Sequence, residues 1–303
     1  MTAEAKTVTV RAAAKINLYL HVTGVREDGY HTLDSLIAFA GVHDTITLTP
    51  ASDIRLTVAG PFAGGLDAGG DNLVSKAVVL LQHAANIDGG AAMVLEKNLP
   101  VASGIGGGSA DAAAALAGLA RLWGLDSTAL NIQELGLSLG ADVPVCVFGR
   151  TAFIDGIGEL ISPAATLPPA WLVLVNPGTQ VSTPAVFQAY HERGAGEGGD
   201  IIRFNQPPAS AQALAEYLHT RRNDLDDAAI GLQPVICDVL ESLQRADQVL
   251  LARMSGSGAT CFGLFADADG ASRAAVKISQ RQPAWWVQAT TLISDSGTLP
   301  ETP

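Results

Sequence analysis

The chain has 303 residues, of which 48% are hydrophobic and 16% are charged, enough to bury the core of one large or two ordinary globular domains. Its net charge is −12, with 18 Lys and Arg against 30 Asp and Glu, so it is a poor candidate for binding long nucleic acids or an anionic membrane. The three cysteines, Cys146, Cys237 and Cys261, form no C-x-x-C pair, which favours neither a disulfide framework nor a zinc site. Because residues 1–10 lack an apolar signal region and no run of about 18 apolar residues occurs, we expect a cytoplasmic protein.

In the first half of the chain, alternation of polar and apolar residues predicts strands over 7–11, 14–22, 44–50 and 54–58. A helix is predicted over 72–85, and a short strand over 93–96 leads into a glycine-rich segment and a second helix. A third helix is expected over 132–139, and residues 140–149 are expected to form a loop followed by a strand.

In the second half, strands are predicted over 151–154, 171–175, 261–265 and 285–291. Helices are predicted over 183–190, 209–219, 223–229, 234–246 and 269–280, with a glycine-rich loop at 194–200 and a disordered tail at 294–303. Helices mixed with hairpins favour an α+β fold over a doubly wound parallel sheet. We expect an N-terminal domain over 1–160 and a C-terminal domain over 161–293.

The most informative stretch is residues 99–124, LPVASGIGGGSADAAAALAGLARLWG. Its glycines precede Ser109, a natural N-cap, so the helix is expected to begin at Ser109 with Asp111 in its first turn. Free backbone N–H groups and the helix dipole at such a start favour a phosphate, and glycines let the backbone approach it closely. A lone glycine cluster also fits a simple turn.

The glycine-rich segment belongs to neither of the two common nucleotide motifs. A P-loop requires Lys-Ser or Lys-Thr after its last glycine, where this chain has Ser109 and Ala110. The dinucleotide fingerprint would require glycine in place of Ser109. A second small-residue loop, SGSGA at 255–259, lies between two strand-like segments. Two such loops in separate halves suit a site between two lobes, although each alone also fits a tight turn.

Four motifs carry a resemblance to known enzymes. PVASGIGGGSADAAAAL resembles the phosphate-binding loop of the GHMP kinase superfamily, and MSGSGATCFGLF resembles its C-terminal glycine motif. AKINLYLHVTGVREDGYHTLDSL at 14–36 and LGADVPVCVFG at 139–149 are similar to one family within it, the 4-diphosphocytidyl-2-C-methyl-D-erythritol kinases. The motifs occur in the family's order between residues 14 and 265.

This resemblance implies a two-lobed fold, with an N-terminal lobe like ribosomal protein S5 domain 2, a ferredoxin-like C-terminal lobe and substrates bound between them. It implies transfer of the γ-phosphoryl group of ATP to the 2-hydroxyl of a cytidine diphosphate-linked polyol, in the non-mevalonate pathway of isoprenoid biosynthesis. Mg²⁺ is expected to arrive with ATP, because no dedicated protein metal site is visible in the sequence. The partners are expected to be small molecules, and the chain a monomer or weak homodimer.

The resemblance also implies roles for individual residues. Asp142 matches the family's general base, and Lys15 matches the lysine that stabilises Asp142 and the transferred group. Taken alone, Asp142 could cap a turn and Lys15 could be a surface charge, although Lys15 lies in an apolar strand. Four residues are implied for the substrate that accepts the phosphoryl group: Asn17 at its polar end, Tyr30 stacked on the cytosine, His31 at the base edge and Phe187 as a second aromatic contact. Tyr30 and His31 would otherwise pack in a turn, and Phe187 would be a core residue.

The ATP site implied by the resemblance comprises Pro100, Val101, Ala102, Ser103, Gly104, Ile105, Gly106, Gly107, Gly108, Ser109 and Ala110, together with Lys97. Asn223 and Asp224 resemble a short family element near the substrate diol. The sequence departs from the family pattern at Ala102 and Ser103, where glycines are commoner, and at Ala110, where serine is usual.

Two other functions remain open at this level. A related kinase for homoserine or mevalonate would share the glycine loop but would have no reason to carry Tyr30 and His31. A non-catalytic nucleotide-binding module is the third possibility, and the joint presence of Lys15 and Asp142 argues against it.

Overall fold

The computed structural model describes residues 7–64, 66, 72–126, 130–194, 203–204 and 206–297. The strands are β1 (Val8–Val25), β2 (His31–Ala51), β3 (Ile54–Ala59), β4 (Gly90–Glu96), β5 (Ala152–Asp155), β6 (Leu160–Pro163), β7 (Trp171–Asn176), β8 (Leu251–Met254), β9 (Cys261–Phe265) and β10 (Trp286–Ile293). The helices are α1 (Leu73–Ala85), α2 (Gly107–Trp123), α3 (Ile132–Leu137), α4 (Val143–Phe148), α5 (Thr183–Glu192), α6 (Ala211–His219), α7 (Asp226–Leu232), α8 (Val235–Gln244) and α9 (Ala268–Arg281). The predicted α+β class is confirmed.

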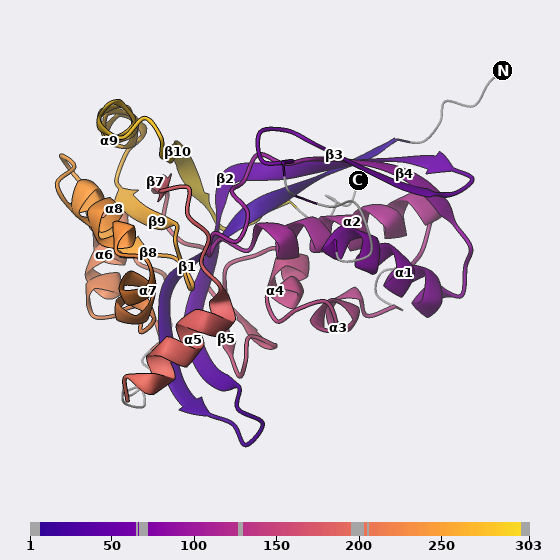
Figure 1. Cartoon of the computed structure of the whole chain (residues 1–303), viewed down its shortest axis with the longest axis horizontal. Coiled ribbons are helices and arrows are strands. Elements are labelled where there is room, and N and C mark those ends of the chain that lie inside the picture. The colour runs from indigo at the N-terminus through magenta and orange to yellow at the C-terminus, as the bar shows by residue number, and fades with distance from the viewer. Residues whose placement is uncertain are drawn as a thin grey trace.

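The first half of the fold is built on a long antiparallel hairpin. β1 and β2 pair from Val8 opposite Leu48 to Val25 opposite His31. The two strands predicted over 7–11 and 14–22 are therefore one strand, interrupted by β-bulges. β4 and then β3 extend the sheet beyond β2, and the helices α1–α4 pack together beneath it (Figure 1).

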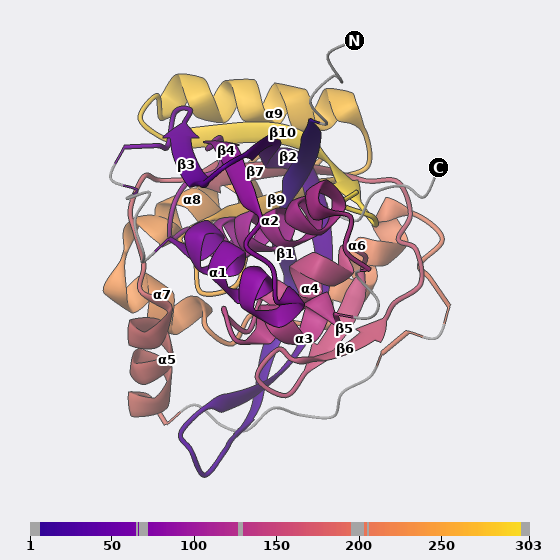
Figure 2. The same cartoon turned by 90° about the vertical axis from the view of Figure 1, so that its right-hand side faces the viewer.

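The second half has a ferredoxin-like topology. Its chain order is β7, the helices α5–α8, β8, β9, α9 and β10, and its strands lie side by side in the order β10-β7-β9-β8 with antiparallel pairing throughout. β10 also pairs with β2 at Leu292 and Ile293, which joins the two halves into one continuous sheet. Figure 2 shows α9 lying along β10, and the β1–β2 hairpin projecting away from both halves.

Three apolar clusters hold this arrangement. One lies between the first-half sheet and α1–α4, and another lies between β7, β9 and α5, α7, α8 and α9. The third contains Ile16 and Leu18 of β1, Leu172 and Leu174 of β7, and Leu218 of α6. Because this third cluster contains side chains from both halves, burial of apolar surface fixes how the halves sit against each other.

Residues 31–43 of β2 and the short strand β6 were not predicted, and two elements beside the cleft differ from their predictions. Residues 143–148 form α4 rather than a strand, because a short apolar run between glycines has no periodicity that separates strand from helix. Pro144 in the first turn was the available signal for a helix start. α2 begins at Gly107 instead of Ser109, because Gly106 takes a left-handed conformation and its carbonyl accepts the first helical hydrogen bond, from Ala110 N–H.

The predicted C-terminal tail also differs from the structure. Its first residues are held by hydrogen bonds to the segment 149–151, since Ser294 O accepts from Thr151 N–H and Ser296 N–H donates to Gly149 O. Residues 298–303 and the 195–200 part of the glycine-rich loop lie outside the described residues. The division into 1–160 and 161–293 stays a prediction. Its boundary falls inside β6, which pairs with β5 and so continues the first-half sheet to Pro163.

In the part of the chain that the structure describes, no helix combines the length and apolar character that a membrane span requires.

Candidate active site

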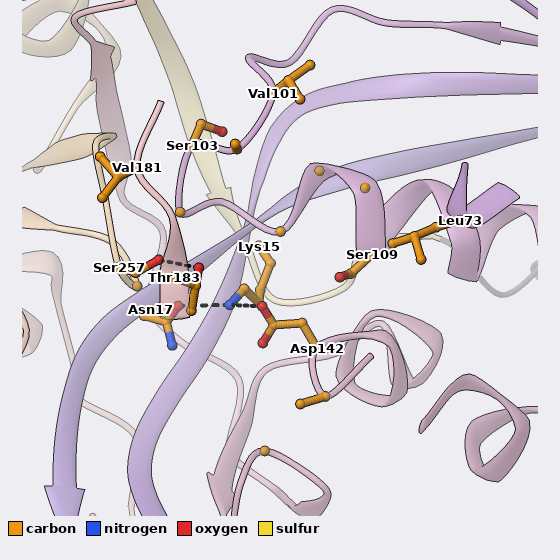
Figure 3. A pocket seen from close by; sticks show the side chains of 18 of the residues that line it. Lys15, Asn17, Leu73, Val101, Ser103, Ser109, Asp142, Val181, Thr183 and Ser257 are labelled. Carbon is orange, nitrogen blue, oxygen red and sulfur yellow. Dashed lines mark hydrogen bonds and ion pairs between the residues drawn. The ribbon is translucent and has the colours of Figure 1, made fainter. Parts of the chain in front are cut away.

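A cleft of about 910 Å³ opens between the two halves. Its walls come from β1, the loop between β4 and α2, the start of α4, the start of α5 and the loop between β8 and β9. Figure 3 shows the side chains of Lys15, Asn17, Asp142 and Ser109 turned toward this space. The cleft therefore joins segments from nearly the whole length of the chain.

The centre of the cleft is a three-residue polar contact. Lys15 Nζ donates hydrogen bonds to Asp142 Oδ2 and to Asn17 Oδ1, each at 2.9 Å (Figure 3). The Lys15 side chain is 4% exposed, whereas that of Asp142 is 41% exposed. Thus a buried ammonium group orients a carboxylate that a substrate can still reach.

The local backbone explains this geometry. β-bulges on both sides of Lys15 and Asn17 interrupt the regular pairing of β1 with β2. Lys15 N–H instead donates to Ile105 O, at 2.9 Å, in the glycine-rich loop between β4 and α2, which we call the phosphate loop. The two side chains are two residues apart and share one face of the strand. Asp142 occupies the N-cap position of α4, yet its side chain makes no capping hydrogen bond. Its carboxylate faces Lys15, and neither the turn-cap nor the surface-charge alternative describes the pair.

The loop between β4 and α2 has the shape expected of an anion site. Gly104 and Gly106 have φ values of 76° and 62°, in the left-handed region that favours glycine. Ala102 also lies there, with φ of 49°, at one of the positions where the family more often has glycine. The first N–H groups of α2 lack helical acceptors and open beside Ser109.

Most of the predicted ATP-site residues line the cleft, and three do not. The lining residues are Val101, Ala102, Ser103, Gly104, Gly106, Gly107, Gly108, Ser109 and Lys97. Ile105 and Ala110 are buried in apolar clusters, so their side chains are unavailable to a ligand. Pro100 instead lines a neighbouring cavity of about 420 Å³, together with the rings of Phe62 and Trp286.

The loop between β8 and β9 is hydrogen-bonded directly to the loop between β4 and α2. Ser255 Oγ donates to Gly104 O at 3.0 Å and accepts from Asn17 N–H at 3.1 Å. Thr260 N–H donates to Ser103 O at 3.0 Å. Ser257 Oγ lies 2.7 Å from Thr183 Oγ1 of α5 (Figure 3). The two loops therefore form one unit between the halves, as their composition suggested.

Because these two loops are in close contact, we expect Gly104→Ala to destabilise the protein strongly. A Cβ at position 104 would lie 2.4 Å from Ser255 O and 2.7 Å from Gly258 N, with the backbone at positive φ. We expect the substitution to lower the free energy of unfolding by at least about 2 kcal/mol, measured by urea denaturation. In the control Gly108→Ala the new Cβ meets only Leu73 Cδ1 at 3.7 Å, and the change should stay within about 1 kcal/mol. Equal stability of the two variants would contradict the proposed packing.

The residues predicted to bind the cytosine are only partly assembled. Phe187 lines the cleft, and its ring stacks on His31 with centroids 5.1 Å apart and an interplanar angle of 27°. Burial lowers the pKa of His31, and His191 adds to this effect. Within the described residues the buried His31 Nε2 has no hydrogen-bond partner. Tyr30 is 61% exposed at the hairpin end, and neither Tyr30 nor His31 is among the residues that line the cleft.

Asn223 and Asp224 hold the fold together instead of lining the cleft. Asn223 Nδ2 donates to Met254 O and Gly256 O at 3.0 and 2.8 Å, and Asp224 Oδ2 accepts from Val22 N–H at 2.8 Å. The structure therefore does not support their predicted place near the substrate diol.

One polar cluster at the site was missed by the sequence-based predictions. Lys97 Nζ is bonded to the buried carboxylates of Asp44 and Asp111, beneath the start of α2. Asp44 is distant in sequence, and Asp111 was interpreted as a first-turn residue. A lysine and an aspartate 14 residues apart on either side of a glycine loop would have been the only hint.

Comparison with known proteins identifies the family of the chain. The model of the GHMP kinases N terminal domain matches residues 72–150, and that of the GHMP kinases C terminal domain matches residues 205–284. A 4-diphosphocytidyl-2-C-methyl-D-erythritol kinase from Paramagnetospirillum magneticum is 50% identical over 286 residues, which cover 94% of this chain and 99% of that protein. The chain belongs to the 4-diphosphocytidyl-2-C-methyl-D-erythritol kinase family of the GHMP kinases.

Solved structures agree with membership in this family. The crystal structure of a 4-(cytidine 5'-diphospho)-2C-methyl-D-erythritol kinase superposes with a TM-score of 0.75 at 35% identity, covering 94% of this chain and 99% of that chain. A homoserine kinase from Cytophaga hutchinsonii superposes with a TM-score of 0.69 over 98% of each chain, but at 17% identity it shares only the fold. This chain is a small-molecule kinase of the GHMP type that uses ATP, and the predicted GHMP kinase fold is confirmed.

Proposed function

We propose that this kinase transfers the γ-phosphoryl group of ATP to the 2-hydroxyl of 4-diphosphocytidyl-2-C-methyl-D-erythritol, giving the 2-phosphate and ADP. The observation that carries the proposal is the Lys15–Asp142 pair, which faces the phosphate loop across one cleft. The relatives at about 50% identity bear the name of this kinase. The reaction would be one step of the non-mevalonate pathway of isoprenoid biosynthesis.

In the proposed mechanism, Asp142 accepts the proton of the substrate hydroxyl while the hydroxyl oxygen attacks the γ-phosphorus. The bond between that phosphorus and the β–γ bridging oxygen breaks, and ADP leaves with the bond electrons. Lys15 orients the Asp142 carboxylate and stabilises negative charge on the transferred group. Asn17 holds Lys15 from the other side and lies where the polar end of the substrate would enter.

The phosphate loop supports ATP binding on physical grounds. The N-terminus of α2 presents N–H groups that lack helical acceptors, and the positive end of a 17-residue helix, to the cleft. The Ser109 hydroxyl turns toward the same space as Asp142 and would contact a phosphate oxygen (Figure 3). Mg²⁺ would come bound to ATP, because among the described residues no cluster of three or more His, Cys, Asp or Glu side chains could hold a metal ion.

The stacked rings of Phe187 and His31 support recognition of a cytosine base. A neutral imidazole can donate from one nitrogen and accept at the other, which suits the edge of cytosine. The lowered pKa of His31 favours its neutral form, and its ring stacks on Phe187 with an Nε2 that has no hydrogen-bond partner among the described residues. We propose that the base enters as Phe187 moves off His31, and that Tyr30 closes from the hairpin onto the other side of the base.

The cytosine site predicts a selective effect of Phe187→Leu. Loss of ring stacking should raise KM for the cytidyl substrate about tenfold and leave KM for ATP within about twofold. Phe187→Tyr keeps the ring and should retain most of the affinity. Steady-state kinetics in both substrates measure this. If Phe187 were only a core residue, Phe187→Leu would lower stability without separating the two KM values.

The function is tested by ADP release from MgATP in the presence of 4-diphosphocytidyl-2-C-methyl-D-erythritol, homoserine or mevalonate. Turnover with the cytidyl substrate alone is expected. Turnover with another alcohol alone would overturn the proposed substrate, and ATP binding without turnover of any of them would favour a non-catalytic module. The cleft is built from a single chain, and we propose that the enzyme works as a monomer or weak homodimer in the cytoplasm, where ATP is supplied.

A further inference from the structure

A buried ionic cluster lies beside the phosphate loop, and two of its members, Lys97 and Asp111, also border the cleft. Lys97, which follows β4, donates to the carboxylate of Asp44 on β2 and to Asp111 Oδ2 on α2, the latter at 2.7 Å. All three residues are at most 3% exposed. We call these three residues, Asp44, Lys97 and Asp111, the loop cluster.

The loop cluster joins the two ends of the phosphate loop. Asp44 Oδ1 also accepts hydrogen bonds from Asn98 N–H at 2.5 Å and Leu99 N–H at 2.8 Å, which holds the start of the loop. Asp111 holds the first turns of α2, where the loop ends. A Cβ at Gly107 would lie 3.3 Å from Lys97 Nζ and 3.8 Å from Asp44 Oδ2. The N–H groups that open to the cleft are therefore positioned by groups immediately beneath them.

The charge of the loop cluster is unbalanced. Two carboxylates share one ammonium group away from water, and a buried charge without a partner is strongly unfavourable. Within the described residues Asp111 Oδ1 is buried and has no hydrogen-bond partner. Burial raises the pKa of Asp111 to about 7, Lys97 opposes this and Asp44 adds to it.

In the described part of the chain, two further titratable side chains near the loop cluster, on α4 and β1, do not neutralise the excess charge. On α4, burial raises the pKa of the Cys146 thiol well above its usual range, so this group is neutral. On β1, the Lys15 ammonium group is bonded to Asp142 and Asn17. Lys97 is bonded to both carboxylates at once. Protonation of Asp111 is therefore the direct route to an uncharged cluster.

We propose that the loop cluster positions the phosphate loop for ATP, and that Asp111 takes up a proton when ATP binds. The inference rests on the proposed function, because it requires the ATP phosphates to lie at the N-terminus of α2. Several negative charges on the cleft side of the loop favour the neutral form of a carboxyl group just behind it. Lys97 then remains paired with Asp44, and the loop keeps its shape.

If ATP binding is coupled to proton uptake by Asp111, the affinity for ATP must depend on pH. Below about pH 7 Asp111 is already protonated in the free enzyme, so ATP affinity should not change with pH through this group. Above about pH 7 binding must draw a proton from solvent, so affinity should fall as pH rises, by at most about tenfold per pH unit.

The first test is titration calorimetry of MgATP at pH 8 in two buffers with different ionisation enthalpies. The wild-type enzyme should take up a substantial fraction of one proton per ATP bound, and Asp111→Asn should take up much less. Asp53→Asn, which removes a carboxylate from an exposed turn, should behave as wild type. ATP binding without proton uptake would overturn this inference alone. Absence of ATP binding to the folded wild-type enzyme would overturn the proposed function as well.

The second test separates positioning from general stability. Asp111→Ala should raise KM for ATP about tenfold and change kcat at saturating ATP less than about threefold, because Lys15 and Asp142 are untouched. Asp111→Asn should recover most of the KM, since its amide oxygen can still accept from Lys97. If Asp111→Asn were as impaired as Asp111→Ala, or if kcat fell without a change in KM, the positioning role would be wrong. Asp111→Asn keeps the side-chain shape and is informative even where Asp111→Ala does not fold.

Discussion

Asp142→Asn is expected to lower kcat at least 100-fold and to leave the Kd for ATP within about threefold. The amide has the same shape and can still accept the hydrogen bond from Lys15, but it cannot take the hydroxyl proton, and a positioned general base contributes about 10²–10⁴ in rate. The Asp142 side chain is 41% exposed and makes no capping bond, so stability should change by less than about 1 kcal/mol. Single-turnover kinetics and calorimetry with ATP measure the two quantities.

The matched control is Asp227→Asn. Asp227 is an exposed carboxylate in the first turn of α7, so its removal changes the charge at a helix start without touching the cleft. It should keep wild-type kcat. Turnover of Asp142→Asn within tenfold of wild type would show that another group, or water, removes the proton.

Lys15→Met is expected to lower kcat by about 10²–10³-fold, the usual effect of removing one group that stabilises developing charge. Methionine fits the buried apolar strand around position 15, so the fold should be retained. Loss of the ammonium group leaves Asp142 without its orienting donor and the transferred phosphoryl group without a nearby cation. Affinity for ATP should change much less, because the backbone N–H groups at α2 remain.

Lys15→Arg and a double variant sharpen this test. Lys15 Nζ points between Asp142 and Asn17 as a compact charge, and a longer, planar guanidinium group would place its N–H groups elsewhere, so Lys15→Arg should not restore activity. If Lys15 and Asp142 act as one unit, Lys15→Met/Asp142→Asn should lose about as much kcat as the worse single variant. Additive losses would mean that the two residues act independently.

The motif-based predictions agree with the structure where the relevant physics is local. The glycine-rich loop followed by an alanine-rich helix has the conformation expected of an anion site, because positive φ, free N–H groups and helix propensity depend on neighbouring residues. Phosphate binding at this loop stays a prediction. The α+β class followed from the same local patterns. The prediction of a strand over 143–148 was wrong because a six-residue apolar run is equally compatible with either element, and only packing against α2 and α3 made it a helix.

The sequence by itself determined the conformation of the glycine-rich loop, most of the elements and, through resemblance, the candidate pair Lys15 and Asp142. Only the tertiary structure decided that these two side chains, 127 residues apart in the chain, lie 2.9 Å from each other at the loop. It also decided that Asp44 and Asp111 share one lysine beneath Gly107, and that Phe187 covers His31 while Tyr30 stays outside the cleft. Such contacts join separate elements, and they form because burial of the apolar clusters brings those elements together, which no local pattern of residues specifies.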